Sequence, residues 1–180
     1  MQTYQGSVDS REVRELNFRE SFFGEIPNAV SPYLLISKGG DSFLQCLAEA
    51  IALQDALPTW DPTNPHPWRA RKLWNAVRGN LSRDLQRQLR FCCSLQTTLQ
   101  ARFGIHGFFI LRDNVAHPVT FSLAAIKGYS DTRWLKANRF IFPNELKDTQ
   151  RIARIGWITA RHLTNSMYES YKMPKRKKLW

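Results

Sequence analysis

The chain has 180 residues, 43% of them hydrophobic, and its 26 lysines and arginines exceed its 15 acidic residues to give a formal net charge of +11. This length suits one domain, and six tryptophans with eleven phenylalanines argue against a disordered chain. No apolar run reaches the roughly 18 residues of a membrane-spanning helix, and we expect no secretory signal because the N-terminus is polar. The charge favours contact with polyanions, with a basic but inert surface as the alternative.

The three cysteines, Cys46, Cys92 and Cys93, indicate a reducing compartment. An odd number that includes an adjacent pair makes a poor disulfide framework. No CxxC pair exists and the histidines are scattered, so we expect neither a metal nor a cofactor.

In chain order, the pattern begins with a polar segment, residues 1–28, with a short helix around Arg11 to Phe18. A buried strand is predicted within residues 29–37, because Tyr33 to Ile36 form an apolar run bounded by proline and glycine. After a glycine pair, apolar residues at helical spacing predict a helix with one buried face, formed by Phe43, Cys46, Leu47, Ala50, Ile51 and Gln54.

Four prolines in the next stretch, LPTWDPTNPHPW, predict an extended loop. Helices are then predicted over Trp68 to Val77 and over Ser82 to Phe103, the second ended by Gly104.

The following segments predict strands. Ile105 to Leu111 and the segment HPVTFSLAAI form an expected hairpin, and Phe140 to Phe142 a third strand. RIGWITARHLTNSMY is compatible with strand or helix, and Trp157, Ile158 and Thr159 favour strand. The predicted fold class is α+β: a single compact domain over residues 29–171, with a small mixed sheet packed by helices.

Basic residues are concentrated in two places. Arg83, Arg87 and Arg90 would share one face of the predicted helix, where they could line a phosphate backbone or form an ordinary solvated surface. The C-terminal tail, residues 172–180, is predicted to be a nuclear import signal or a polyanion-binding arm, with a disordered end as the alternative; its basic cluster is Lys175, Arg176, Lys177 and Lys178.

The turn before the first buried helix carries the clearest catalytic candidate, Ser42. A strand, a glycine turn and a helix N-terminus expose the first helical residue, and the free amides there can stabilise an oxyanion or lower the pKa of a thiol. The alternative is an ordinary turn and helix cap.

YLLISKGGDSFLQCLAEAI resembles the nucleophile segment of the ovarian-tumour (OTU) family of papain-like cysteine proteases, which includes deubiquitinases. On that pattern Ser42 occupies the place of the nucleophilic cysteine, and Cys46 is a core thiol. SLQTTLQARFGIHGFFILRD is similar to the later helix-to-strand unit of the family. The resemblance implies a papain-like fold, with backbone amides around Gly39, Gly40 and Asp41 serving the oxyanion.

In the family the catalytic histidine lies on the last core strand, often before an aromatic residue. His162 is favoured for this role because it follows a segment predicted as strand, and His117 is the alternative base. By proximity, Thr164 or Asn165 would orient the histidine.

Two functions therefore remain open. The first is an OTU-like protease or deubiquitinase acting on ubiquitin or a ubiquitin-like protein, and silenced because a serine hydroxyl is far less acidic than a thiol. The second is a basic protein that binds RNA or DNA without catalysis, such as a viral matrix or ribonucleoprotein component, with Trp60, Trp68 and Trp180 as stacking candidates. Either would act in the cytoplasm or nucleus of a eukaryotic host.

Overall fold

The computed structural model describes residues 10–24, 42–56, 60–124 and 137–172. The strand predicted within residues 29–37, the turn residues Gly39, Gly40 and Asp41, and the basic tail residues 175–178 and Trp180 lie outside the described residues. The described helices are α1 (Ser10–Phe23), α2 (Phe43–Ala56), α3 (Trp68–Arg78), α4 (Arg83–Gln88), α5 (Thr98–Phe103) and α6 (Thr149–Lys172). The described strands are β1 (Leu89–Cys93), β2 (Gly107–Leu111), β3 (Asn114–Leu123) and β4 (Arg139–Ile141).

The four strands form one small mixed sheet in the order β1-β2-β3-β4. The first three strands are antiparallel neighbours, and β4 runs parallel to β3. The predicted hairpin is confirmed, since Phe109 pairs with Val119 and Leu111 with Asn114 across a bulge. The third strand is also confirmed, beginning one residue earlier than predicted.

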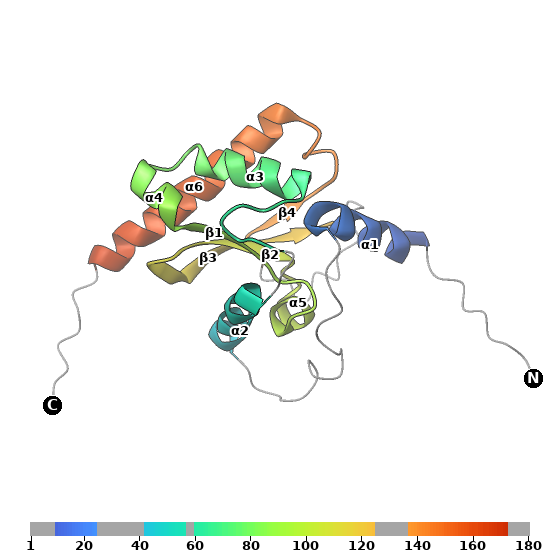
Figure 1. Ribbon diagram of the computed structural model, residues 1–180, viewed down its shortest axis with the longest axis horizontal. Helices are drawn as coiled ribbons and strands as arrows, with labels where there is room; N and C mark the ends of the chain where they lie inside the picture. The colour runs from blue at the N-terminus through green and yellow to red at the C-terminus, as the bar shows by residue number, and fades with distance from the viewer. Residues whose placement is uncertain (1–9, 25–41, 57–59, 125–136, 173–180) are drawn as a thin grey trace, which may run out of the picture.

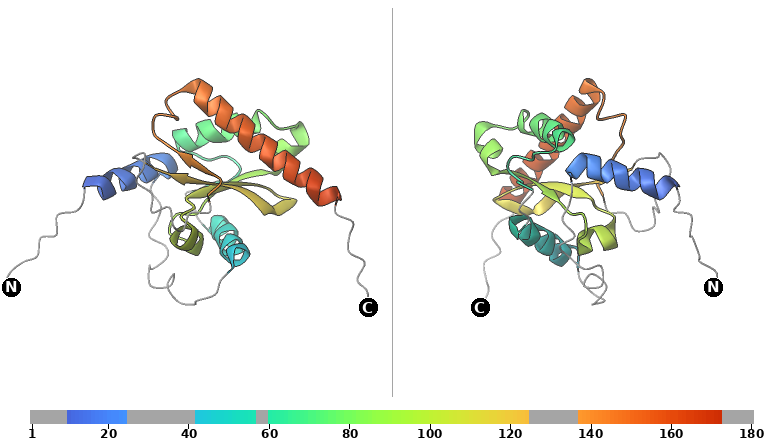
Figure 2. Two further views of the ribbon diagram at one scale, coloured as in Figure 1. Left: turned by 180° about the vertical axis from the view of Figure 1, so that it is seen from behind. Right: turned by 45° about the vertical axis from the view of Figure 1, so that its right-hand side comes forward.

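Helices cover both faces of this sheet: Figures 1 and 2 show α3 and α6 on one side and α2 and α5 on the other. On one face α6 packs against α3 and the sheet, and on the other α2 packs against α5 and β1. Alternation along β2 explains the two cores: Phe109 and Leu111 join the α3–α6 side, whereas Phe108 and Ile110 join the α2–α5 side. The mixed helix and strand content therefore agrees with the predicted α+β class.

Aromatic rings fill the centre of the α3–α6 side. Phe91 of β1 stacks on Phe109 with ring centroids 4.3 Å apart, and rings from α1 and β3 close around them. Trp60 belongs to this core, because its indole N–H donates to the Phe91 carbonyl over 2.9 Å and only 6% of the residue is exposed. Its predicted role as an exposed stacking residue is therefore wrong.

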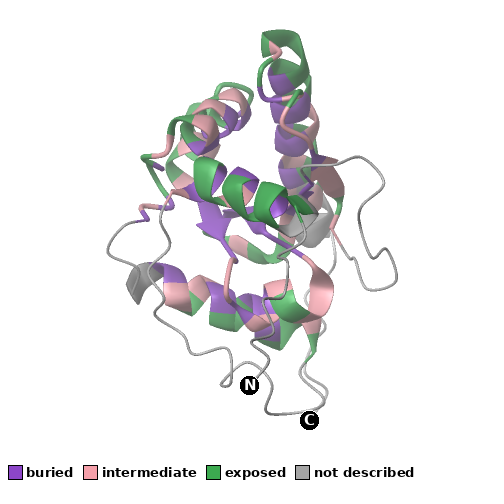
Figure 3. Cartoon of the chain, turned by 90° about the vertical axis from the view of Figure 1, so that its right-hand side faces the viewer, coloured by how far each residue is buried: buried purple, intermediate pink, exposed green. Residues whose placement is uncertain are grey.

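In Figure 3 the strands are largely buried, whereas the outer sides of the helices are exposed.

The single helix predicted over residues 82–103 is wrong, because this segment forms α4, β1 and α5. Leu89 to Cys93 extend and pair with β2, and both of their faces are then buried by the two helical layers. The chain turns back at Gln96, which has a φ of 60°, and Thr97 caps α5 by accepting from the Gln100 N–H. Consequently Arg90 lies on β1 and cannot share a helix face with Arg83 and Arg87 of α4.

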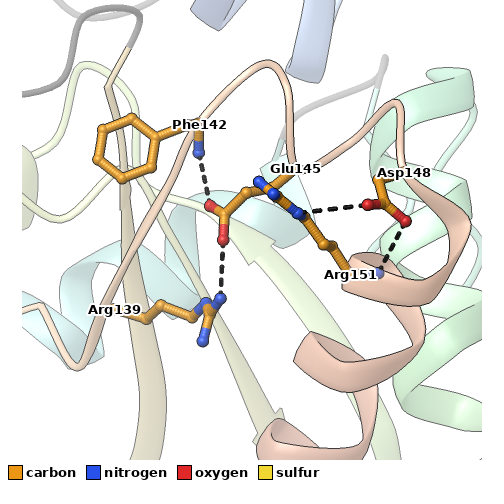
Figure 4. A network of polar contacts seen from close by, with 5 residues as sticks. All are labelled: Arg139, Phe142, Glu145, Asp148 and Arg151. Atoms are coloured by element: carbon orange, nitrogen blue, oxygen red, sulfur yellow. Dashed lines mark hydrogen bonds and ion pairs between the residues drawn. The ribbon is translucent and has the colours of Figure 1, made fainter.

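The strand favoured around Trp157 is also wrong, because residues 149–172 form the long helix α6. Asp148 caps it: one carboxylate oxygen accepts from the Gln150 and Arg151 N–H groups, and the other pairs with the Arg151 guanidinium over 3.2 Å. In the turn from β4, Glu145 accepts from the Phe142 N–H and the Arg139 guanidinium (Figure 4). These contacts fix where α6 begins relative to the sheet.

Within the described part of the chain, no helix combines the length and the apolar character needed to cross a membrane.

Candidate functional site

Ser42 caps helix α2 through a reciprocal pair of hydrogen bonds. Its Oγ accepts from the Gln45 N–H over 3.3 Å, and the Gln45 side chain accepts from the Ser42 N–H over 2.7 Å. This is the capping box typical of a Ser-x-x-Gln sequence, and the Ser42 carbonyl accepts the first helical bond from the Cys46 N–H. The side chain is exposed, so both the turn-and-cap alternative and a substrate-facing position agree with its place.

The three cysteines are buried free thiols. Cys46 is fully buried in the α2–α5 core, as its apolar position predicted. Burial raises the pKa of the Cys93 thiol to about 12, so this sulfur stays protonated and unreactive at neutral pH. None of the three cysteines therefore offers an accessible thiol, and Ser42 is the described residue of the turn predicted to carry a nucleophile.

Both candidate histidines line one cavity of about 590 Å³. Residues 116–120 of β3 supply one wall, and α6 contributes His162 and Ser166. Phe43, the residue after Ser42, and Asn138 complete the lining. The cavity thus joins the start of α2 to the two predicted bases, while Ser42 itself does not line it.

The basis for preferring His162 is lost, since His162 lies on a helix rather than after a strand. His117 does lie on a strand, β3, and is the better match to the family pattern. Thr164 donates its hydroxyl to the Ala160 carbonyl of its own helix over 2.8 Å, so that hydroxyl proton is already engaged. Asn165 is exposed.

The last strand of the described sheet carries no histidine. In β4 the residue that precedes the aromatic Phe140 is Arg139, and its guanidinium is paired with Glu145 over 2.9 Å. Against the expected pattern, position 42 carries serine and the last strand of the described sheet carries arginine before its aromatic residue.

A second candidate site lies on the outer surface of α3 and α6. We call it the α3–α6 face; its residues are Trp68, Arg71, Lys72, Arg78, Arg154, Trp157 and Arg161. Lys72 is half-buried and the others are exposed. The two helices touch directly, because a methyl group placed on Gly156 would lie 2.5 Å from the Ala76 carbonyl. Figure 2 shows α6 crossing the sheet beside α3.

Charge is distributed unequally between the two helical layers. Helix α3 carries four basic residues and no acid, and α6 carries four basic residues and one acid. On the opposite face of the sheet, α2 carries Glu49 and Asp55 and no basic residue, and α5 carries Arg102 and no acid. The net positive charge of α3 and α6 therefore favours an anionic partner on their side of the sheet.

Trp157 and Arg161 were not among the residues predicted from sequence, because their segment was expected to be a strand. A helical signal was nevertheless present: the buried residues of α6 follow a helical period, and they are Ile152, Ile155, Gly156, Thr159, Ala160 and Leu163. Trp68, which was predicted, is 58% exposed, and Trp157 is 52% exposed.

Among the described residues, no group of three or more histidines, cysteines and acids is arranged to hold a metal ion. The chain matches no protein-family model, and no curated protein and no solved structure matches it. The OTU resemblance thus rests on the residues of its two motifs.

Proposed function

We propose that this protein binds nucleic acid through the α3–α6 face and that Ser42 performs no catalysis in the chain as written. The observation that supports this most directly is the exposed array of arginines and tryptophans on two packed helices. Arginine binds phosphate in a planar, two-pronged geometry, and its charge persists at every physiological pH. Release of the counterions held by phosphate would supply the binding free energy.

The packing of the two helices suits such a surface. The close contact of Gly156 with Ala76 brings the two helix backbones together, so one bound strand could reach the exposed side chains of both helices. Helices bearing few acids present little repulsion to a phosphate backbone. A binding role also needs no nucleophile, which agrees with the use of the Ser42 hydroxyl as a helix cap.

The test is the affinity of the full chain for a single-stranded oligonucleotide after the change Arg154→Gln together with Arg161→Gln. A matched control removes two exposed charges elsewhere, Arg14→Gln on α1 and Arg112→Gln in the β2–β3 turn. We expect the first pair to weaken binding about tenfold or more and the control to change it little, because only the first pair removes phosphate contacts. Equal affinities for the two double variants would refute the α3–α6 face as the binding surface.

A second candidate function is OTU-type isopeptide hydrolysis, silenced by serine at position 42. The cavity that joins Phe43 to His117 and His162 favours it. In an active form, a thiolate at position 42 would attack the isopeptide carbonyl, and a histidine would return the proton to the leaving lysine amine. Ubiquitin or a ubiquitin-like protein would then be the partner.

This candidate is tested with Ser42→Cys and a ubiquitin-based suicide probe. Because the three native thiols are buried, the wild-type protein should not react with the probe and serves as the control. If the site is competent, we expect an adduct with Ser42→Cys that is lost on adding His117→Ala and retained on adding His162→Ala. Absence of an adduct from about pH 6 to about pH 9 would count against a protease site, because a thiol at a helix N-terminus is ionised over much of that range.

A further inference from the structure

Two of the exposed large hydrophobic residues in the described chain are tryptophans, and both lie on the α3–α6 face. Trp60 and Trp74, by contrast, are only 6% and 7% exposed and belong to the core. An indole that remains more than half exposed on a helix leaves a large aromatic surface in water. Aromatic surface of this kind is the usual platform on which unpaired bases stack.

Each of these tryptophans has an arginine beside it. The Arg69 guanidinium carbon lies 5.3 Å from the centroid of the Trp68 ring, and the Arg161 carbon lies 5.4 Å from that of Trp157. Arg69 also donates to the Ser21 hydroxyl of α1, which restrains its position. Each guanidinium lies over one face of its ring, so a base would stack on the opposite face and the arginine would remain close enough to pair with its phosphate.

The two platforms are spaced along the surface. Trp157 follows Gly156, which contacts Ala76, and Trp68 lies two helical turns before Ala76 on α3. The backbones of Trp68 and Ala76 are thus roughly 12 Å apart along the axis of α3, at 1.5 Å per residue. The two tryptophans come from different helices, so each would offer its ring to a different nucleotide of one strand.

We propose that the ligand of this face is single-stranded nucleic acid whose unpaired bases stack on Trp68 and Trp157. A duplex keeps the faces of its bases stacked on one another, so it would reach the arginines through phosphate alone. The proposal rests on the proposed function and adds to it the class of nucleic acid bound.

The experiment measures the affinity of the full chain for four probes at one salt concentration. They are a single-stranded DNA of about 12 nucleotides, the same strand made abasic, the corresponding duplex, and inorganic polyphosphate. The variants are Trp68→Leu with Trp157→Leu, and as a matched control Trp68→Phe with Trp157→Phe. Both indoles are exposed, so unfolding midpoints close to that of the wild type should show that the fold is retained.

We expect the leucine pair to lose roughly tenfold to hundredfold in affinity for the base-containing strand and nothing for the abasic strand or polyphosphate. The phenylalanine pair, which keeps a π face, should recover most of the affinity. The wild type should bind the single strand more tightly than the duplex.

The inference is overturned if the leucine pair binds the base-containing strand as the wild type does, or if it loses affinity equally for the abasic strand. If the leucine pair binds the base-containing strand as tightly as the wild type does, binding of both proteins to polyphosphate would still support the proposed function. Absence of binding to all four probes would instead overturn the proposed function itself, so the two failures are distinguishable.

Discussion

Two polar side chains, Ser42 and His106, use their hydrogen-bonding capacity within the fold. Ser42 caps α2. His106, which is 5% exposed, accepts the Leu123 N–H on Nδ1 over 2.8 Å, and the Ser122 hydroxyl lies 3.1 Å from the same nitrogen. With Nδ1 as the acceptor of the Leu123 N–H, the neutral ring carries its proton on Nε2. This histidine therefore links the residues between α5 and β2 to the end of β3.

Burial lowers the pKa of His106 from its ordinary 6.5 to about 3, and the positive charge of Arg19 acts in the same direction. In the unfolded chain His106 is protonated below about pH 6.5, whereas in the folded chain it is protonated only below about pH 3. The stabilisation is therefore complete above pH 6.5 and is lost as the pH falls through this window. We expect the free energy of unfolding to fall by up to about 1.4 kcal/mol per pH unit from this group.

Urea unfolding at several pH values in that window measures the effect. His106→Gln, whose side-chain oxygen can still accept the Leu123 N–H, should show a shallower dependence on pH than the wild type. His117→Gln, at an exposed histidine, is the control and should keep the wild-type slope. An unchanged slope in His106→Gln would show that His106 is not the group responsible.

At the scale of elements, the contact between α3 and α6 leaves no room for added volume at Gly156. A methyl group on Gly156 would meet both the Ala76 backbone and its side chain at 2.5 to 2.7 Å, and backbone cannot move aside cheaply. The same contact sets the positions of the exposed residues that follow Gly156, including Trp157.

We expect Gly156→Val to reduce the free energy of unfolding by about 1–3 kcal/mol and to weaken nucleic-acid binding, because α6 must move away from α3. Ala153→Val, an exposed position one turn earlier, adds a similar branched side chain without the clash and is the control. Urea denaturation of both variants checks this. Equal stability of the two would mean that the helices separate without cost.

How far the sequence predicted the elements depended on how local their determinants are. The spacing from Phe43 to Gln54 contained the whole signal for α2, which forms as expected with Cys46, Leu47, Ala50 and Gln54 buried. The conformation of β1 depends instead on pairing with β2, which lies more than ten residues later, so a plausible helical spacing over residues 82–103 was misleading. In α6, aromatic and branched residues favoured strand locally, but packing against α3 and the sheet selects helix.

At the scale of the whole molecule, the described chain presents two candidate surfaces with different chemistry, and α6 contributes residues to both. The layer of α3 and α6 is basic and presents exposed indoles, and the cavity with His117 and His162 lies beside residues 116–120 of β3. The sequence predicted the overall charge and Trp68. It could not predict which basic residues share a surface, because that depends on which helices become neighbours. It likewise named both histidines but could not place them in one cavity.

The salt dependence of binding tests the central claim, phosphate-led binding at the α3–α6 face, most directly. We predict that log affinity for a single-stranded oligonucleotide falls linearly with log salt, and that Arg154→Gln with Arg161→Gln makes the slope shallower by about 0.7 for each phosphate contact removed. The Arg14→Gln and Arg112→Gln control should keep the wild-type slope. A slope near zero in the wild type, or the same slope in both double variants, would contradict the account.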